Sequence, residues 1–322
     1  MKPILCNYYI TYRCNTRCEF CDIQQTYGKK VKVDCSFEDV KRNLPQLKST
    51  GIRFIDFTGG EPLLHKQLPD MLNAAKKTGL YTSITTNCLL YPERASELAG
   101  LVDFLHFSLD SLDEKENDSM RGQGSFSKVM ESFQIAKKLG EHPDLLFTVT
   151  ESNFQAIKAL ADFAQENKLI LIVNPIFQYS KQKLINIKIL DYIEKFQISP
   201  YVYQNRALHR LLRSGGNKRT FPRCRAVTST IVISPNNEVL FPCFHFQQLA
   251  LPIKDDLKQV RNSPKIKLFK KQQGTFSFCE GCTINCYFDP SFLYRIDSYF
   301  WLSLSSKMKY GVDKYLRTKL RW

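Results

Sequence analysis

Three cysteines near the amino terminus are spaced so that they could hold one metal centre. Cys14, Cys18 and Cys21 lie within eight residues, shortly after an apolar run at residues 4–10. Three thiolates can bind three irons of an iron–sulfur cube, whereas a tetrahedral structural site needs a fourth ligand nearby. Cys6 and Cys35 lie outside this loop, so one iron is left open for a small molecule. A zinc knuckle or a group of unrelated buried thiols is the alternative.

A second short motif follows the next apolar run. Gly59, Gly60, Glu61 and Pro62 come directly after residues 52–57, which have the composition of a buried strand. Glycines have no side chain and therefore let the backbone approach a ligand closely. A simple turn is the alternative, and the adjacent Glu-Pro pair favours the ligand-binding interpretation.

The cysteine loop, with its CxxxCxxC spacing and an aromatic residue before the last thiol, and the later Gly-Gly-Glu-Pro motif together resemble the radical S-adenosylmethionine (SAM) superfamily. The resemblance implies a [4Fe–4S] cluster whose open iron chelates the amino and carboxylate groups of SAM. Reduction by a flavodoxin or ferredoxin then yields methionine and a 5′-deoxyadenosyl radical, which abstracts hydrogen from a substrate. It also implies that the carbonyl groups of residues 59–62, with Glu61, accept hydrogen bonds from the amino group of SAM.

Further elements are similar to this superfamily. Asn87 ends a Thr-Asn element in which Cys88 occupies the usual glycine position, and Ser108, Asp110 and Arg121 match its Ser-Leu-Asp and Arg-Gly elements. The resemblance implies that the serine and the arginine contact the amino-acid end of SAM, and a guanidinium can hold a carboxylate with two parallel hydrogen bonds. An ordinary surface arginine is the alternative, and for Cys88 a spare packed thiol is favoured over a catalytic one.

Five more cysteines occur in the last hundred residues. One pair brackets residues 231–238, which predict a β-hairpin, and three more form a compact loop. Thiols at these spacings can surround a second cluster. The layout resembles the Twitch or truncated SPASM extension of radical SAM enzymes, which implies one auxiliary [4Fe–4S] cluster. The implied ligands are Cys224, Cys243, Cys279 and Cys282, with Cys286 either replacing one of them or idle. Zinc bound by the same four thiols is the alternative.

The composition limits the partners and the compartment. The net charge is +15, which attracts anionic partners without choosing among them, although solvated surface lysines explain it equally well. Nucleic acid is not favoured. The eleven cysteines cluster at metal-ligand spacings, and the sequence shows neither a signal peptide nor an apolar run of membrane-spanning length. We therefore predict a cytoplasmic protein.

The elements that must position these residues follow an alternating pattern. Amphipathic helical patterns separate six short apolar runs, at residues 4–10, 54–58, 81–86, 104–109, 145–149 and 169–173. The pattern predicts an α/β fold, a partial (β/α)6 TIM-like barrel over residues 1–205, with functional loops at the carboxyl ends of the strands. We expect a small auxiliary iron–sulfur module at residues 206–290 and a helical tail at residues 291–322.

Two basic segments lie outside the predicted barrel. Seven Lys or Arg residues and no acidic residue occur from Arg206 to Arg225, which predicts either a solvated linker or a rim that docks an anionic substrate. The tail is rich in aromatic and basic residues, so it predicts an amphipathic helix. Such a helix either packs on the barrel or gives a peripheral association with a membrane.

We predict an enzyme that acts on a small molecule, a lipid, isoprenoid or pigment intermediate or a phosphorylated metabolite, with the auxiliary cluster aiding oxidation. A peptide-modifying maturase is the alternative. Because the first strand begins at about residue 4, we expect no peptide-recruiting domain before it. A non-catalytic iron–sulfur electron-transfer protein, or a nucleic-acid-binding one, is the alternative from another class.

Overall fold

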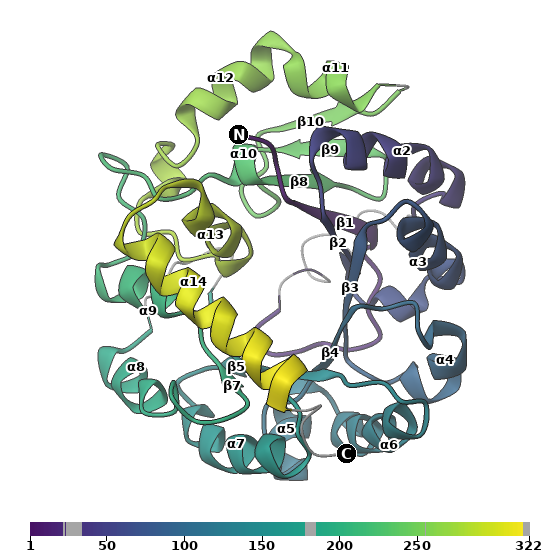
Figure 1. The fold of residues 1–322 in the computed structure, drawn as a ribbon, viewed down its shortest axis with the longest axis vertical. Coiled ribbons are helices and arrows are strands. Elements are labelled where there is room, and N and C mark those ends of the chain that lie inside the picture. Colours follow the sequence, from purple (N-terminus) through teal and green to yellow (C-terminus); the bar gives the residue numbers. More distant parts are fainter. Residues whose placement is uncertain (22, 24–33, 178–184, 255, 318–322) are drawn as a thin grey trace.

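The computed structural model describes residues 1–21, 23, 34–177, 185–254 and 256–317. The strands of these residues form one sheet in the order β10-β9-β8-β1-β2-β3-β4-β5-β6-β7. From β1 to β7 every neighbouring pair is parallel, and the sheet curls into a partial barrel that helices surround (Figure 1). The bounds are β1 (Leu5–Thr11), β2 (Phe54–Gly59), β3 (Tyr81–Thr86), β4 (Phe104–Ser108), β5 (Asp144–Val149), β6 (Leu171–Pro175) and β7 (Val202–Tyr203).

The helices that follow these strands cover the outer face of the barrel. They are α2 (Phe37–Thr50), α3 (Leu68–Lys77), α4 (Tyr91–Leu98), α5 (Glu114–Arg121), α6 (Ser125–Lys138), α7 (Ile157–Glu166) and α8 (Ile187–Glu194). The predicted α/β barrel is therefore confirmed. The alternating pattern did not predict α5, because its sequence Glu-Lys-Glu-Asn-Asp-Ser-Met-Arg has almost no apolar residue to mark a buried face.

Side chains alternate between the helices and the interior of the barrel. In β2, Ile55 and Phe57 are fully buried against the helices, whereas Phe54 and Asp56 point inward and stay partly accessible. The same alternation holds in β4 and β6. The interior, which we call the lumen, is consequently open rather than filled by packed side chains.

The second part of the chain continues the same sheet. β8 (Thr230–Ile233) pairs in parallel with β1 and in antiparallel with β9 (Glu238–Phe241), which in turn pairs with β10 (Leu249–Pro252). The predicted hairpin is present, and Asn237 in its turn has a φ of 58°, a conformation that asparagine tolerates. Around the hairpin lie α10 (Ala226–Ser229), α11 (Leu257–Asn262) and α12 (Pro264–Gln272).

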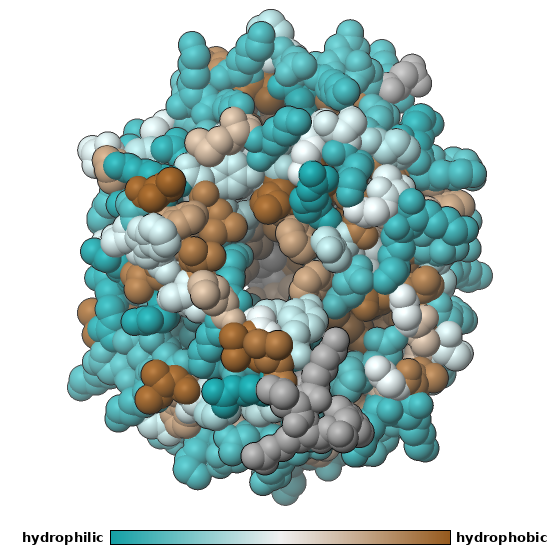
Figure 2. Space-filling model, in the orientation of Figure 1, coloured by the Kyte–Doolittle hydropathy of each residue, from teal (hydrophilic) through white to brown (hydrophobic). Residues whose placement is uncertain are grey.

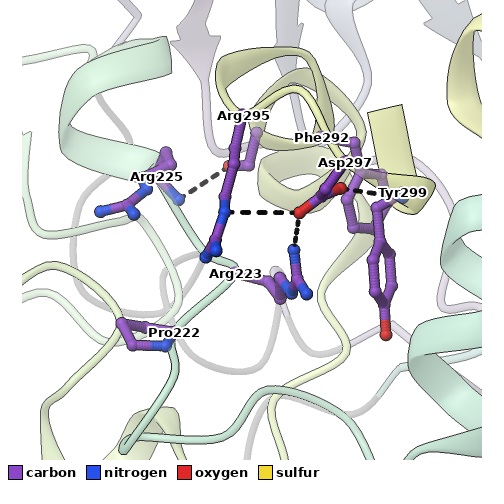
Figure 3. A pocket seen from close by; sticks show the side chains of 8 residues that line it. Pro222, Arg223, Arg225, Phe292, Arg295, Asp297 and Tyr299 are labelled. Atoms are coloured by element: carbon purple, nitrogen blue, oxygen red, sulfur yellow. Dashed lines mark hydrogen bonds and ion pairs between the residues drawn. The ribbon is translucent and has the colours of Figure 1, made fainter. Parts of the chain in front are cut away.

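The basic segment is folded and joins the barrel to the carboxyl-terminal region. It begins with α9 (Arg206–Arg213), whose Arg213 contacts Asp191 at 2.5 Å and Glu194 at 2.7 Å. Arg223 and Arg295 both form ion pairs with Asp297, the residue that caps the next long helix (Figure 3). These contacts give Arg213 and Arg223 a structural role. The solvated segment and the docking rim both remain predictions for the exposed basic residues, which are Arg206, Arg210, Lys218 and Arg219.

The carboxyl-terminal helices close one end of the barrel. α13 (Asn285–Ser291) leads to α14 (Ser298–Gly311), which crosses the end of the barrel where the strands begin (Figure 1). We call this end the amino-terminal mouth. Tyr310 donates a hydrogen bond of 2.6 Å to Asp144 at the start of β5, and Lys309 donates to the carbonyl of Val202 at the start of β7. The aromatic residues of α14 are only partly buried, since Tyr299 is 8% exposed but Trp301 is 59% exposed.

Within the described residues, no helix combines the length and the hydropathy that crossing a bilayer requires.

Candidate active site

The cysteine loop lies at the carboxyl end of β1, where the barrel fold places functional groups. Thr16 Oγ1 is 3.3 Å from Cys14 Sγ and 3.6 Å from Cys18 Sγ, so these two thiols face one hydroxyl group. The amide of Cys21 donates to the carbonyl of Cys18 at 3.1 Å, which forms a tight turn between these two cysteines. Burial raises the pKa of Cys14, so a metal bound there must displace a proton from the thiol.

The two glycines after β2 bring the next loop against the cysteine loop. The amide of Gly60 donates to the carbonyl of Thr11 at 3.1 Å, and that of Glu61 donates to the carbonyl of Arg13 at 2.8 Å. A Cβ on Gly59 would lie 1.9 Å from the Thr11 oxygen, and one on Gly60 would lie 2.1 Å from the Arg13 oxygen. No other residue fits at either position, so the pair is required for this close approach.

Glu61 fastens this loop to the end of β3. One of its carboxylate oxygens accepts from the amide of Leu63 at 3.0 Å and from the hydroxyl of Thr86 at 2.9 Å, and the other accepts from the amide of Asn87 at 2.8 Å. Burial raises the pKa of Glu61 to about 7, although the hydrogen bonds from these groups act to lower it. The carboxylate therefore holds the loops in place, and the backbone carbonyl groups of residues 59–62 become the better candidates to accept from a ligand.

Asn87 reaches from β3 back to the cysteine loop. Its side-chain amide donates to Asn15 Oδ1 at 2.7 Å and lies 3.4 Å from Thr16 Oγ1. The following Cys88 has a φ of 67°, the left-handed conformation that glycine adopts easily, and its thiol is fully buried. The structure thus places Cys88 as a packed thiol, as the sequence analysis favoured.

An ion pair connects the end of β4 to α5. Arg121 Nε lies 2.6 Å from Asp110 Oδ2, and both side chains are almost completely buried. The guanidinium also lies over the ring of Phe20 with 5.3 Å to its centroid, and Cys18 Sγ lies 3.9 Å from the carbonyl of Arg121. Ser108, which ends β4, is 5% exposed. The predicted Ser-Leu-Asp and Arg-Gly elements therefore border the cysteine loop.

The second cysteine group surrounds a separate cavity. Cys224, Cys243, Cys279 and Cys282 line this cavity together, and burial raises the pKa of Cys243 and of Cys282 to about 12. Cys286 lines a different cavity, the lumen of the barrel. Among the described side chains, no three Cys, His, Asp or Glu residues are grouped to hold one metal ion. The same holds for the amino-terminal cysteine loop, so this finding does not distinguish zinc from an iron–sulfur cluster at either group of described cysteines.

Asn217, which no motif indicated, ties the segments of the second group together. It is fully buried, and its side-chain oxygen accepts from the amides of Arg223 at 2.9 Å and Cys224 at 3.3 Å. Its side-chain nitrogen donates to the carbonyls of Gly274 at 2.9 Å and Cys279 at 3.0 Å. One asparagine thereby connects the Cys224 segment to the Cys279–Cys282 loop and fixes their separation.

The lumen forms a cavity with a volume of about 630 Å³. Asp56 and His106 line it, and both titrate abnormally. Burial raises the pKa of Asp56 to about 6, and burial lowers that of His106 to about 4 although Asp144 opposes the shift. Sequence reasoning missed both residues, yet one signal was present: each is the one ionisable side chain in an otherwise mostly apolar strand.

Comparison with known proteins decides the family. A family model described as the Radical SAM superfamily matches residues 8–164, which contain the cysteine loop, the glycine loop and the Asp110–Arg121 pair. Residues 8–164 form a domain of the radical SAM superfamily. Members of this superfamily use a [4Fe–4S] cluster and SAM, so the cofactor prediction is confirmed for the family domain. Three thiols in one loop, with a glycine pair that brings backbone acceptors against them, fit these two groups.

Individual relatives resemble this radical SAM protein over different shares of its length. Fe-coproporphyrin III synthase of Methanosarcina barkeri is 30% identical over 58% of this chain and 47% of its own length. The chain spans about half the length of the first curated relatives it matches.

Two solved structures share the fold at low sequence identity. Streptococcus suis SuiB bound to the precursor peptide SuiA superposes with a TM-score of 0.68 at 20% identity, covering 92% of this chain and 76% of SuiB. The enzyme anSMEcpe with bound AdoMet superposes with a TM-score of 0.65 at 18% identity, covering 98% of this chain and 99% of anSMEcpe. The barrel and the carboxyl-terminal region therefore both follow a known fold.

Proposed function

We propose that this radical SAM protein cleaves SAM reductively and removes a hydrogen atom from a substrate bound in the lumen. The supporting observation is the convergence of the cysteine loop, the glycine loop, Asn87 and the Asp110–Arg121 ion pair at the carboxyl ends of β1 to β4. The open lumen lies on the inner side of the same strands, and its lining includes Thr85, two residues before Asn87, so a substrate in it would lie next to the carboxyl end of β3.

Each residue takes a role that its contacts support. Cys14, Cys18 and Cys21 would hold the [4Fe–4S] cluster, and together with SAM this cluster supplies a 5′-deoxyadenosyl radical when bound. The carbonyl groups of residues 59–62 would accept from the amino group of SAM. Ser108 and Arg121 would bind its carboxylate, because the pairing of Arg121 with Asp110 through Nε fixes the direction of the guanidinium. A flavodoxin or ferredoxin would donate the electron.

The second cysteine group would hold one auxiliary [4Fe–4S] cluster. Cys224, Cys243, Cys279 and Cys282 are its proposed ligands, since they line one cavity and Cys286 lines another. A cluster binds each thiolate to a different iron and therefore needs thiols further apart than a single ion does. The cluster would accept an electron from a substrate radical, which favours oxidation, or would bind the substrate.

The substrate is proposed to be a small molecule. The lining of the lumen is mostly apolar with a few polar side chains, the usual composition of small-molecule sites. A peptide is the second candidate, which the likeness to SuiB with its bound precursor peptide favours.

Product analysis tests the proposed activity. Anaerobically reconstituted protein, reduced with dithionite and incubated with SAM, is expected to form 5′-deoxyadenosine. Replacing Cys14, Cys18 and Cys21 by alanine should reduce its formation to the background rate. Cys6→Ala is the matched control, because Cys6 is fully buried in β1 and is not a member of the cysteine loop. Equal 5′-deoxyadenosine from the triple variant, or none from iron-loaded wild type, would refute the proposal.

A further inference from the structure

The lining of the lumen changes from apolar to polar along the strands. On three strands the first inward residue is apolar and the next inward residue, two positions along, is polar: Leu5 and Asn7, Phe54 and Asp56, Phe104 and His106. Strands run from the amino-terminal mouth toward the cysteine loop. On the strand side, the mouth end of the lumen therefore suits a hydrocarbon chain and the deeper part suits a polar group. On the side of α13 and α14, the lining also contains the Lys307–Asp289 ion pair.

The helix that crosses this mouth exposes an apolar stripe. Trp301, Met308, Val312 and Leu316 are separated by seven, four and four residues, which places them along one side of α14 and its continuation. Their exposed fractions are 59%, 63%, 42% and 56%. Meanwhile Gly311, Tyr315 and Lys307 of the same segment line the lumen, so the stripe borders the opening of the cavity.

Other apolar residues lie on the same end of the barrel. Tyr81 begins β3, Leu139 caps the end of α6 and Ile198 precedes β7, and each is between 40% and 88% exposed. Figure 2 shows the hollow of the lumen opening on this face, with apolar side chains gathered near it. We call the stripe and these three residues the mouth surface.

Basic residues accompany the mouth surface. The outer helices run opposite to the strands, so their last turns lie at the mouth, where Lys76, Lys77, Lys137 and Lys138 are exposed. Four acidic groups at this end are engaged with the protein itself, whereas Glu166 at the end of α7 is exposed. Asp103 pairs with Lys76, Asp144 pairs with Lys314, and Asp313 pairs with Lys309. Glu141 accepts a hydrogen bond from the amide of Gly100.

We propose that the mouth surface docks on an anionic bilayer and that an amphipathic lipid enters the lumen from it. The polar group of the lipid would lie among Asn7, Asp56 and His106, and the hydrocarbon chain would point toward the membrane. This substrate assignment rests on the proposed function, because the polar end of the lipid would react only with the radical that SAM cleavage at the cysteine loop produces. A helix with an apolar side and neighbouring lysines binds bilayers by burial plus attraction to anionic headgroups. A second copy of this chain is a poorer occupant, since a symmetric contact would place like charges together.

Vesicle sedimentation tests the docking. Cluster-loaded full-length protein should bind vesicles of phosphatidylcholine with a quarter phosphatidylglycerol at least fivefold better than pure phosphatidylcholine at low salt, and high salt should remove the difference. Trp301→Ser with Met308→Ser should weaken this binding about tenfold. Leu268→Ser is the matched control, because Leu268 is 53% exposed on α12, away from α14. Unchanged binding in the double variant, or none in wild type, overturns the docking. So does a wild-type dimer that the double variant converts to a monomer.

A substitution at Gly311 tests the lumen. Gly311 lines the cavity, a Cβ added to it would meet no atom within 4 Å, and its φ is not positive, so a side chain there adds bulk without backbone strain. Gly311→Leu should weaken binding of a fluorescent probe, 11-(dansylamino)undecanoic acid, at least fivefold. Gly311→Ala should change it less than twofold. Equal binding by wild type and Gly311→Leu, or no binding by wild type, overturns the lipid assignment.

5′-Deoxyadenosine formation by the same variants separates the two proposals. Normal SAM cleavage together with failed vesicle and probe binding overturns only the membrane inference. Absent SAM cleavage in wild type overturns the proposed function, whereas the docking result then stands on sedimentation alone.

Discussion

Both carboxylate oxygens of Glu61 accept hydrogen bonds from protein groups. This changes which atoms of the glycine loop are candidates to bind a ligand. A motif shows that a residue type recurs at a spacing, but it does not show which atoms are already engaged. Here the engaged carboxylate leaves the backbone carbonyls as the better acceptors for a ligand. Asp110 acts similarly, because it accepts from the amide of Thr148 at 2.8 Å and pairs with Arg121.

Asp56 gives a prediction about pH. Burial raises its pKa to about 6, above the ordinary 3.8, so the folded state holds the proton more tightly than the unfolded state does. Stability from this residue is therefore present at low pH and is lost as pH rises through 6. Asp56→Asn should be more stable than wild type by about 1–2 kcal/mol at pH 8, a value reduced because the side chain lines an open cavity.

Thermal unfolding of the two proteins between pH 5 and pH 8 measures this effect. The difference should shrink toward pH 5, where Asp56 is protonated. A constant difference across this range would show that the ionisation of Asp56 does not contribute.

Cys286 gives a second prediction at the residue scale. Because it lines the lumen and not the cavity of the second cysteine group, Cys286→Ala should keep about eight irons per chain, the content of two [4Fe–4S] clusters. Cys282→Ala, the matched variant, should retain about four irons. Iron analysis of the reconstituted proteins tests this prediction. Equal iron loss in both variants would place Cys286 among the ligands.

At the scale of elements, the site depends on how closely two loops pack. Gly59 has a φ of 154°, and its Cα faces the carbonyl of Thr11 in the neighbouring strand. Gly59→Ala should reduce 5′-deoxyadenosine formation at least a hundredfold, because the added Cβ must push the glycine loop away from the cysteine loop. The comparison variant is Gly100→Ala. Gly100 also has a positive φ, but there is open space around it, so this substitution should lower the stability by only about 1 kcal/mol. Similar activity in both variants would contradict the close-packing argument.

The sequence predicted the strands better than the directions of the side chains. Apolar runs located the first six strands to within about two residues, because a strand buried against helices must be apolar on its outer face. The position of Cys286 could not be read from cysteine spacing. It is the second residue of α13 and lines the lumen, yet burial and the nearby thiols of Cys243 and Cys282 raise its pKa, so it also lies close to the second cysteine group. Asn217 was missed because one buried asparagine has no pattern around it.

At the scale of the whole molecule, contacts with one buried carboxylate, Asp144, hold α14 in place across the amino-terminal mouth. Asp144 is 1% exposed and contacts Lys314 at 2.6 Å, Tyr310 at 2.6 Å and His106 at 3.7 Å. The tail predicted from its composition is thus anchored by ion pairs, while its apolar stripe stays outside. Composition showed that aromatic and basic residues were present, but not which of them face the barrel.

The anchor gives a prediction for the mobility of α14. Lys314→Met with Tyr310→Phe leaves Asp144 buried without these two partners, which should destabilise the docked helix by about 3 kcal/mol. Hydrogen exchange should then become faster in residues 298–317 and remain unchanged in α3. Lys158→Met, at an exposed ion pair with Asp162, is the control and should have no effect above about 0.5 kcal/mol. Uniform exchange in all variants would show that packing alone holds α14.

The pairing of β8 with β1 has a consequence for how such proteins can diversify. Cys6 of β1 faces Ile231 of β8 on one side and Ile55 of β2 on the other, so the strand leading to the cysteine loop has neighbours on both edges. Residues beyond 225 are therefore not an exchangeable cassette. A replacement extension grafted from another protein would have to supply its own strand in the register of β8, or it would leave an unpaired edge that recruits foreign chains.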